Sequence, residues 1–543
     1  MGRQSAGEGF LRAIVELAGE HPLVGIGQHP AWAQAFRALI SEADPGRKAA
    51  WIASDNLRDL AGVGAIHLPD PSLAEQAYLR TRVGSAAFSI TGITHTVSSM
   101  NAMRMIAQIP MAPLMPWDAL ICTSQAVKAA VEQILTVQEQ YVRWKFGASR
   151  APQRPELPII PLGVHPADFL ISDAERQDAR RQLGINPDEV VYMFLVRLSF
   201  HAKAHPFQMF AALEHAALHG GSKIVLLQCG WFANEHIERA FRNGTAKVCP
   251  SVRSLWLDGR KHDERRAAWG ASDVFMSLSD NIQETFGLTL IEAMAAGRSV
   301  IASDWDGYRE TVEDGVSGFL IPTFMPHPRI GEELSLLHAA GTLDYDRYIG
   351  LCSQMVSLDQ RSLRSATLAL ARDGALRERM GRAGRARAMA LFDWKVVIGR
   401  YRELWAELHS RRDAVLSQQG PQIRGVMADQ LPPFQLFSGY PSHQLSADCT
   451  IQAASSRHSP QELLRDTLFT LGHDLIRDTE LLPQILSLVR SEAQPVAPAT
   501  IAQRLGLADS RLWTALAVMA KMELIEVVAP AGAGQPATPS EQA

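Results

Sequence analysis

One short segment carries residue types that suit a phosphorylated ligand. Glu284 and Glu292 flank Gly287, and a glycine lets the backbone approach a ligand closely. The segment follows a predicted strand and opens a predicted helix, whose free N–H groups suit a phosphate. A carboxylate in a helix can accept two hydrogen bonds from a ribose diol, and one in the preceding loop can reach a sugar. Spacing alone leaves open an ordinary strand-to-helix turn with one helix-facing glutamate.

Two series of alternating strands and helices must position this segment. Short apolar runs, several apolar throughout, are typical of strands buried on both faces of a parallel sheet. We therefore predict an α/β protein with two doubly wound domains, with ligands bound in a cleft beyond the carboxyl ends of the strands. The first series has strands at 23–27, 86–94, 119–123 and 157–162, with helices at 10–20, 100–108 and 124–135. The second has strands at 190–196, 223–228, 254–257, 274–278, 300–303 and 319–321, with helices at 206–219, 234–242 and 288–296.

The segment around Glu284 continues into a longer pattern. After Glu292 come Ala-Met-Ala-Ala-Gly at 293–297, a predicted strand, Gly-Tyr-Arg-Glu at 307–310 and the run 314–320. This pattern resembles the retaining glycosyltransferases of family 4, which carry an E-x7-E motif, an Ala-Met-Ala-x-Gly turn and a Gly-x-x-Glu segment. The resemblance implies the GT-B fold, in which two Rossmann-like domains face a cleft.

The same resemblance implies roles for the charged residues. Arg197 and Lys203 look like the family's clamp for the diphosphate of a nucleotide-sugar donor, where two cations would stabilise the charge on the leaving group. Glu292 would bind the donor ribose, and Glu284 would face the transferred sugar. The alternative for the two cations is an exposed strand end.

Backbone and base contacts are also implied by the resemblance. Phe286, Gly287 and Leu288 would meet the sugar and the diphosphate with their backbone. Gly259 and Arg260 occupy the region where the family usually holds the base.

The N-terminal half offers further candidates. His95 follows a predicted strand where the family often has a histidine that reaches the donor sugar; the alternative is a capping or buried histidine. Asp118 looks like the family's strand entry, with a structural role, and Ser124 is the predicted N-cap of the next helix. Gly7 and Gly9 look like the acceptor loop, although no strand precedes them. We expect either that the true start lies upstream or that this strand has been lost.

The family resemblance implies front-face attack with retention of configuration, in which the leaving phosphate helps to deprotonate the acceptor. The sequence shows no metal-ligand cluster, so we expect no metal and no cofactor besides the nucleotide-diphosphate sugar, which is a substrate. Two-carboxylate hydrolysis is not excluded by spacing, but the Arg/Lys clamp favours a diphosphate donor. Domain closure would assemble the cleft and exclude water.

Bulk properties bound the remaining possibilities. The chain has 543 residues, enough for about three domains, and a formal net charge of −4, so no strong field attracts it to nucleic acid or anionic lipid. Its five scattered cysteines fit a reducing compartment. No apolar run approaches the ~20 residues of a membrane helix. We expect a cytoplasmic protein and leave peripheral membrane attachment open.

We predict five regions along the chain. Residues 1–170 form the acceptor domain, 171–411 the donor domain, 412–460 a linker, 461–530 a small helical module and 531–543 a disordered tail. The module resembles a winged helix: helices at 460–471 and 480–489, then a helix-turn-helix at 500–505 and 510–522 around Gly506, and a wing strand at 524–528.

The module carries little net charge for binding DNA. Four basic and four acidic residues balance across 481–530, so we do not expect a nucleic-acid partner and favour a protein partner or self-association. A packing appendage is the alternative. These residues are Arg490, Arg504, Arg511, Lys521, Glu492, Asp509, Glu523 and Glu526.

Three rival functions stay open: a winged-helix regulator, a non-catalytic GT-B scaffold and a nucleotide-sugar epimerase. The presence of both clamp cations and both glutamates argues against a scaffold, and the run 284–297 fits a transferase better than an epimerase. The base, UDP or GDP, and the sugar are undetermined. The expected acceptor is a glycan or lipid-linked molecule of surface polysaccharide synthesis.

Overall fold

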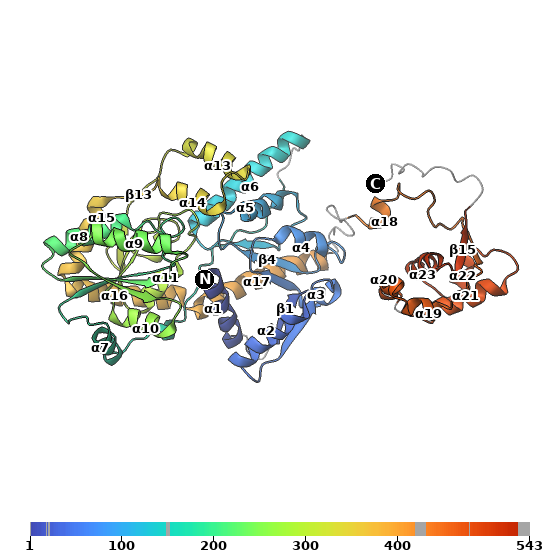
Figure 1. Ribbon diagram of the computed structural model, residues 1–543, viewed down its shortest axis with the longest axis horizontal. Coiled ribbons are helices and arrows are strands. Elements are labelled where there is room, and N and C mark those ends of the chain that lie inside the picture. Colours follow the sequence, from blue (N-terminus) through green and yellow to red (C-terminus); the bar gives the residue numbers. More distant parts are fainter. Residues whose placement is uncertain are drawn as a thin grey trace. The chain divides into compact units, whose positions relative to one another are not determined.

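The chain forms two compact units, Met1–Met427 and Ala428–Ala543. The computed structural model describes residues 2–17, 19, 22–147, 152–418, 431–476 and 478–529. Figure 1 shows the elements in sequence colours. Within the described residues, no helix is both long and apolar enough to cross a membrane. The five cysteines, all at described positions, are unpaired.

The second α/β domain of the first unit is built on a six-stranded parallel sheet with the order β11-β10-β9-β6-β7-β8. All six predicted strands are confirmed. The inner strands are mostly apolar and the sheet buries them on both faces, whereas β8 and β11 lie at its edges and are only partly buried. The strands are β6 (Val190–Leu195), β7 (Ile224–Gly230), β8 (Arg253–Asp258), β9 (Val274–Ser277), β10 (Ser299–Ser303) and β11 (Gly318–Ile321).

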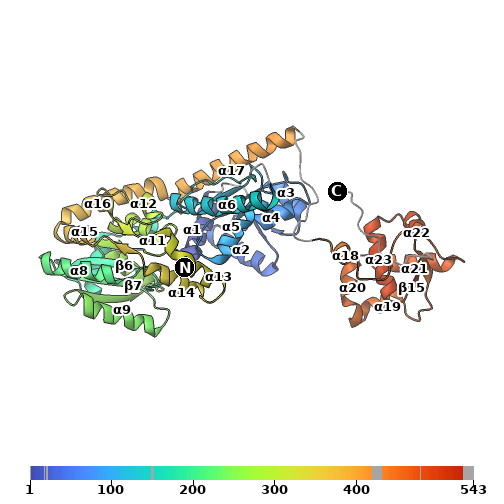
Figure 2. The same ribbon diagram turned by 90° about the horizontal axis from the view of Figure 1, so that it is seen from above.

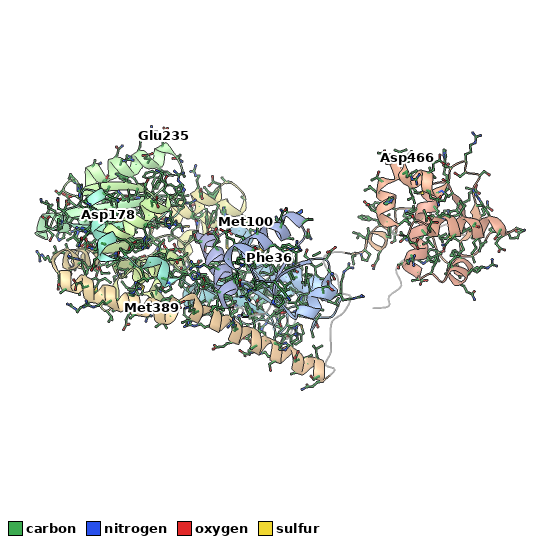
Figure 3. All side chains as sticks on the ribbon, turned by 90° about the horizontal axis from the view of Figure 1, so that it is seen from below. Phe36, Met100, Asp178, Glu235, Met389 and Asp466 are labelled. Carbon is green, nitrogen blue, oxygen red and sulfur yellow. The ribbon has the colours of Figure 1, made fainter. Side chains whose placement is uncertain are left out.

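Helices cover both faces of this sheet, so the domain is doubly wound. One core joins α8 (Phe207–His219), α9 (Glu235–Val248) and α15 (Gln360–Arg372) to one face. A second core joins α7 (Asp173–Gln182), α10 (His262–Ala271) and α11 (Leu288–Ala295) to the other. Asp178 on α7 and Glu235 on α9 mark the two layers in Figure 3.

The strands of the first α/β domain form two separate parallel sheets, β1-β2 and β3-β4-β5. The predicted strands near 23, 89 and 119 are confirmed, whereas β2 and β3 were not predicted. The strands are β1 (Leu23–Gly27), β2 (Ala49–Ala53), β3 (Ala65–Leu68), β4 (Ser89–Ile93) and β5 (Ala119–Ile121). Around them lie α2 (Pro30–Ala43), α3 (Leu57–Val63), α4 (Leu73–Arg80), α5 (Met100–Gln108), η1 (Ile109–Met111) and α6 (Gln125–Phe146).

The predicted strand at 157–162 is wrong. This segment runs beside β5 but makes only isolated bridges there, such as Cys122 with Ile159. Pro155, Pro158 and Pro161 interrupt it, and proline cannot donate to a strand ladder.

The last helix of the first unit returns to the first α/β domain. Figure 2 shows α17 (Trp394–Ser417) extending from the second α/β domain along the first. Arg412 donates to the carbonyls of Gly64 and Ala87, and Trp405 Nε1 donates to Thr91 Oγ1 at 3.3 Å. The predicted donor domain, which ended at 411, therefore shares its final helix with the first domain. The predicted linker begins later than expected, because α17 continues to Ser417.

The predicted acceptor loop is also wrong, because Gly7 and Gly9 lie inside helix α1 (Gly2–Leu17). Ala6 and Ala13 are buried, so this helix packs its apolar face into the core. A Cβ at Gly9 would stand 2.7 Å from Trp394 Nε1. Gly9 thus permits α1 to pack closely against Trp394, the first residue of α17.

A helical segment connects β11 to α15. It contains Tyr345 and the other residues of α14, which lie near the site described below. In order come β12 (Thr323–Phe324), η3 (Pro328–Gly331), α13 (Glu332–Ala339), α14 (Tyr345–Ser353) and β13 (Ser357–Leu358). Elsewhere in the domain lie η2 (Pro166–Phe169), α12 (Tyr308–Thr311), α16 (Gly374–Arg387) and the π-helix η4 (Ala388–Phe392). Residues 332–411 are mostly helical.

The second unit has its own core of buried Leu, Ile and Val residues. The helices predicted at 480–489, 500–505 and 510–522 are confirmed, with Gly506 in the left-handed region (φ +61°) at the end of α22. The helix predicted at 460–471 is broken: α19 ends at Arg465, and η5 and α20 follow it. The linker prediction fails at β14, which pairs antiparallel with β15 and buries Ile451 in the core of this unit. The predicted tail, 531–543, lies outside the described residues. The elements are α18 (Pro433–Leu436), β14 (Thr450–Ala453), α19 (Pro460–Arg465), η5 (Thr467–Phe469), α20 (Thr470–Leu475), α21 (Leu481–Ser491), α22 (Pro498–Leu505), α23 (Asp509–Lys521) and β15 (Ile525–Val528).

Candidate active site

A cavity of about 960 Å³ lies between the two α/β domains of the first unit. Its wall includes His95 after β4 and several residues that follow β6, β7 and β9 in the second domain. The carboxyl ends of parallel strands therefore meet at this cavity, where doubly wound sheets bind ligands. Two Rossmann-like domains that face such a cleft constitute the GT-B arrangement predicted from the sequence.

The clamp candidates and Glu284 are brought together in this cavity. Arg197 and Lys203 lie in the loop after β6, and both line the wall with Glu284. Lys203 Nζ lies 3.7 Å from Glu284 Oε2. Both side chains keep access to solvent, with exposed fractions of 29% and 18%. When a ligand enters, Lys203 can leave Glu284 and bind an anionic group of the ligand. Glu284 can then accept hydrogen bonds from hydroxyl groups of the ligand.

The turn before α11 brings backbone to the cavity. Phe286, Gly287 and Leu288 all line it, as their sequence positions predict. Gly287 has a φ of +89°, and a Cβ there would stand 2.1 Å from Cε1 of Tyr308. Only glycine fits both conditions. Gly287 also has no side chain to cap α11, so the start of this helix can offer N–H groups to an anion.

Glu292 lines the cavity from inside α11. Burial raises the pKa of Glu292 to about 7, and the charge of Arg265 opposes this rise. A carboxyl with this pKa lacks full solvation, so hydrogen-bond donors from a ligand would stabilise its ionised form. A vicinal diol supplies two such donors.

His95 reaches the cavity from the loop after β4. Two residues hold this loop from the second domain: Thr285 Oγ1 donates to the carbonyl of His95 at 3.0 Å, and Tyr345 OH shares a hydrogen bond with Ser98 Oγ at 2.8 Å. The histidine therefore lies beside the turn that carries Glu284.

Of the two residues predicted near the base, only Gly259 lines the cavity, and Arg260 is not among its described lining residues. The Arg260 guanidinium instead donates to both oxygens of Asp258, which lowers the pKa of Asp258 to about 2, and Arg260 is 60% exposed. In the free protein, Asp258 thus binds the guanidinium of Arg260, and the part of Arg260 in holding the base stays a prediction.

Among the lining residues that sequence reasoning missed are Trp231, Arg265 and Arg266. Trp231 directly follows β7, so the rule that ligands bind at carboxyl strand ends could have found it. The arginines lie on α10, and their only signal was a pair of adjacent cations in the helix after β8.

The two structural predictions nearby hold. Asp118 is fully buried and receives two hydrogen bonds from Arg80, at 2.6 and 2.7 Å. Ser124 caps α6 by accepting from the backbone N–H of Val127, and its hydroxyl donates to Asp306 in the second domain. Burial raises the pKa of Asp306 to about 7.

Within 2–17, 19, 22–147, 152–418, 431–476 and 478–529, no three His, Cys, Asp or Glu side chains are grouped so that they could hold a metal ion.

Comparison with protein families associates the second α/β domain with glycosyl transfer. Residues 175–330 match the family described as Glycosyl transferases group 1. This stretch contains the six-stranded sheet, the clamp candidates and both glutamates. The match covers less than half of the chain.

Curated relatives agree with this association. The phosphatidyl-myo-inositol mannosyltransferase of Mycobacterium leprae is 35% identical over 134 residues, which are 24% of this chain and 26% of that protein. The D-inositol 3-phosphate glycosyltransferase of Segniliparus rotundus is 26% identical over 324 residues, 59% of this chain and 69% of that protein. The chain thus spans about a quarter of the mycobacterial relative's length.

Solved structures include the Anabaena protein HepE in complex with UDP and glucose. The similarity has a TM-score of 0.46 at 14% identity and covers 75% of this chain and 96% of that one. A glycosyltransferase from Rickettsia africae gives a TM-score of 0.46 at 14% identity, over 75% and 94%.

Proposed function

We propose that this protein is a retaining glycosyltransferase that moves a sugar from a nucleotide-diphosphate sugar to an acceptor hydroxyl. The observation that carries the proposal is the convergence of Arg197, Lys203, Glu284 and Glu292 with the start of α11 in one interdomain cavity. Two cations and a helix N-terminus suit a diphosphate, and the carboxylates suit the hydroxyls on either side of it.

The proposed roles follow from these positions. Glu292 accepts hydrogen bonds from the ribose, while Arg197 and Lys203 face the diphosphate. When the donor binds between Lys203 and Glu284, Glu284 accepts hydrogen bonds from hydroxyls of the transferred sugar. As the anomeric carbon–phosphate oxygen bond breaks, its electron pair passes to the diphosphate, and the cations stabilise that charge.

Retention requires attack from the face that the diphosphate leaves. In the proposed reaction, the acceptor oxygen bonds to the anomeric carbon on that face, and the acceptor proton passes to the departing phosphate oxygen. His95 lines the cavity from the first domain and would contact the sugar. This route needs no protein carboxylate as a covalent nucleophile.

The proposed acceptor is a glycan or lipid-linked molecule, with a role in surface glycan synthesis. Two relatives are named for acceptors that contain inositol, so inositol compounds belong in the acceptor panel. For the second unit, self-association or contact with a protein partner is the proposed role.

The direct test is product analysis with UDP-hexoses and GDP-hexoses beside the acceptor panel. We expect release of the nucleoside diphosphate and a glycoside that keeps the donor's anomeric configuration, read by NMR. An inverted product would refute retention. A free epimerised nucleotide sugar formed without acceptor would favour the epimerase and contradict the transferase.

A further inference from the structure

Helix α14 contacts three loops that carry candidate catalytic residues. These loops are 94–99 with His95, 199–205 with Lys203, and 279–285 with Glu284. The helix belongs to the segment that connects β11 to α15 and lies with α13 at one side of the unit in Figure 1. None of its residues is among the described lining of the cavity. Any influence of α14 on a ligand must therefore pass through the loops.

The first contact joins the two domains. Tyr345, the first residue of α14, shares a hydrogen bond with Ser98 Oγ at 2.8 Å. Ser98 is buried and also lies 3.0 Å from Thr96 Oγ1, and Thr96 itself lines the cavity. The Tyr345 hydroxyl is thus linked through Ser98 to the loop that presents His95.

The second contact is with the loop of Lys203. Asp346 Oδ2 lies 3.8 Å from His201 Nε2, and a Cβ at Gly350 would stand 3.0 Å from the Cβ of His201. The helix backbone therefore packs closely on this loop. The side chain of Asn281 donates to the carbonyl of His201 at 2.6 Å, which ties the second loop to the third.

The third contact is buried. Ser353 Oγ donates to Asp280 Oδ1 at 3.1 Å, and Asp280 also accepts from the backbone N–H of His205. Ser353 and Asp280 are both almost fully buried, so this bond is protected from water. Asp280 lies four residues before Glu284, on the same loop.

We propose that α14 is an interdomain buttress, in which Tyr345 and Ser353 are positioning residues for the transfer reaction. Tyr345 fixes the His95 loop against the second domain, and Ser353 fixes the Lys203 and Glu284 loops relative to each other. This inference rests on the proposed function for its catalytic meaning, while the buttress itself is a property of the free protein.

The test compares Tyr345→Phe with Tyr348→Phe. Both changes remove one phenol hydroxyl from the same helix, but the Tyr348 ring stacks on His338 at 4.4 Å, within the connecting segment. Hydrogen–deuterium exchange is measured on the free, full-length protein, with thermal midpoints recorded to confirm folding. We expect Tyr345→Phe to speed exchange at residues 94–99 about fivefold, the effect of one lost hydrogen bond. Tyr348→Phe should leave these amides unchanged.

Ser98→Ala supplies the second arm. Ser98→Ala removes the bonds of Ser98 to both Tyr345 and Thr96. Because Tyr345 is proposed to act through Ser98, the double variant should exchange no faster than Ser98→Ala alone. Additive effects of the two substitutions, or equal exchange in Tyr345→Phe and Tyr348→Phe, would overturn the buttress.

Turnover of the UDP-hexose or GDP-hexose that wild type uses gives the catalytic readout. Tyr345→Phe should lower kcat about fivefold and leave the donor dissociation constant unchanged, because its loop carries neither clamp cation. An unchanged kcat beside faster exchange would refute the positioning role. If wild type bound and consumed no nucleotide sugar, the proposed function would fail, while the exchange experiment would still decide the buttress.

Discussion

The pKa of Glu292 gives donor binding a specific pH dependence. Burial raises this pKa from 4.5 to about 7, so the carboxyl is mostly protonated at pH 6 and mostly ionised at pH 8. With a pKa of 7, the ionised fraction is about a tenth at pH 6 and about nine-tenths at pH 8. A ribose diol donates hydrogen bonds and is held better by a carboxylate than by a carboxylic acid. If only the ionised form binds, the donor dissociation constant is about tenfold larger at pH 6 than at pH 8.

The assay is calorimetric titration with an intact nucleotide sugar at both pH values. Its diphosphate is a diester that stays fully ionised in this range, so the ligand contributes no titration of its own. Glu292→Gln should bind more weakly than wild type at pH 8 and should lose the pH dependence. The variant is needed because Asp280 and Asp306 also have pKa values raised to about 7.

The same pKa shift predicts that ionisation of Glu292, which favours donor binding, lowers the stability of the folded protein. A carboxyl with a raised pKa favours the folded state least when ionised, so its unfavourable contribution grows as pH rises from 4.5 to about 7. Glu292→Gln should therefore unfold at a higher temperature than wild type at pH 8, with a smaller difference at pH 5. Equal donor affinity at pH 6 and 8, or a pH dependence that Glu292→Gln keeps, would refute this reasoning.

Three further substitutions test the site and its support. Glu284→Ala should lower turnover about 10- to 100-fold, the equivalent of one charge-assisted hydrogen bond, with little change in donor affinity; steady-state kinetics beside calorimetry would expose a pure binding effect instead. Gly287→Ala should destabilise the protein more than Gly297→Ala, because both glycines have positive φ (+89° and +70°) but only at Gly287 would a Cβ meet Tyr308, at 2.1 Å. Both substitutions cost about 1–2 kcal/mol because alanine is strained in the left-handed backbone conformation. Equal thermal midpoints of the two variants would show that Tyr308 moves away from the new Cβ. Asp118→Ala should cost about 3–5 kcal/mol in urea unfolding, since it leaves a buried guanidinium unpaired, and a loss below 1 kcal/mol would contradict that burial.

The second α/β domain could be predicted from sequence because its strands carry their own signal. The four inner strands, β6, β7, β9 and β10, are mostly apolar runs between turns, and the sheet buries them almost completely. The motif around Glu284 then fixed which strand ends form the cavity wall. The local motif and the overall fold indicate the same place for the site, since Gly287 of the motif lines the cavity at the strand ends.

The first α/β domain was less predictable because its elements depend on distant partners. β2 and β3 are short, and β3 contains His67, whose ring packs among Phe10, Tyr401 and Trp405 from the two ends of the unit. No local pattern encodes such a contact. Gly7 and Gly9 were read as a loop for the same reason: the packing of α1 on α17 tolerates glycines that would weaken an isolated helix.

Individual side chains were the hardest to place. Arg260 follows the predicted base-region strand, yet Asp258 takes its guanidinium, and spacing does not reveal which cation finds a local partner. Arg265 was missed because its role depends on the direction in which α10 leaves the sheet. The contacts of α14 are likewise tertiary: Tyr345 meets Ser98 across 247 positions of sequence.

The most direct test of the central claim is calorimetric binding of UDP, GDP and their hexose conjugates to wild type, Lys203→Ala and Lys261→Ala. Lys261 is the matched control, since it is 66% exposed and pairs with Glu264, 2.8 Å away. A nucleotide-sugar site predicts saturable binding of one diphosphate nucleotide, weakened about 10- to 100-fold by Lys203→Ala and unchanged by Lys261→Ala. Absence of binding across the whole panel, or equal affinity in wild type and Lys203→Ala, would contradict it.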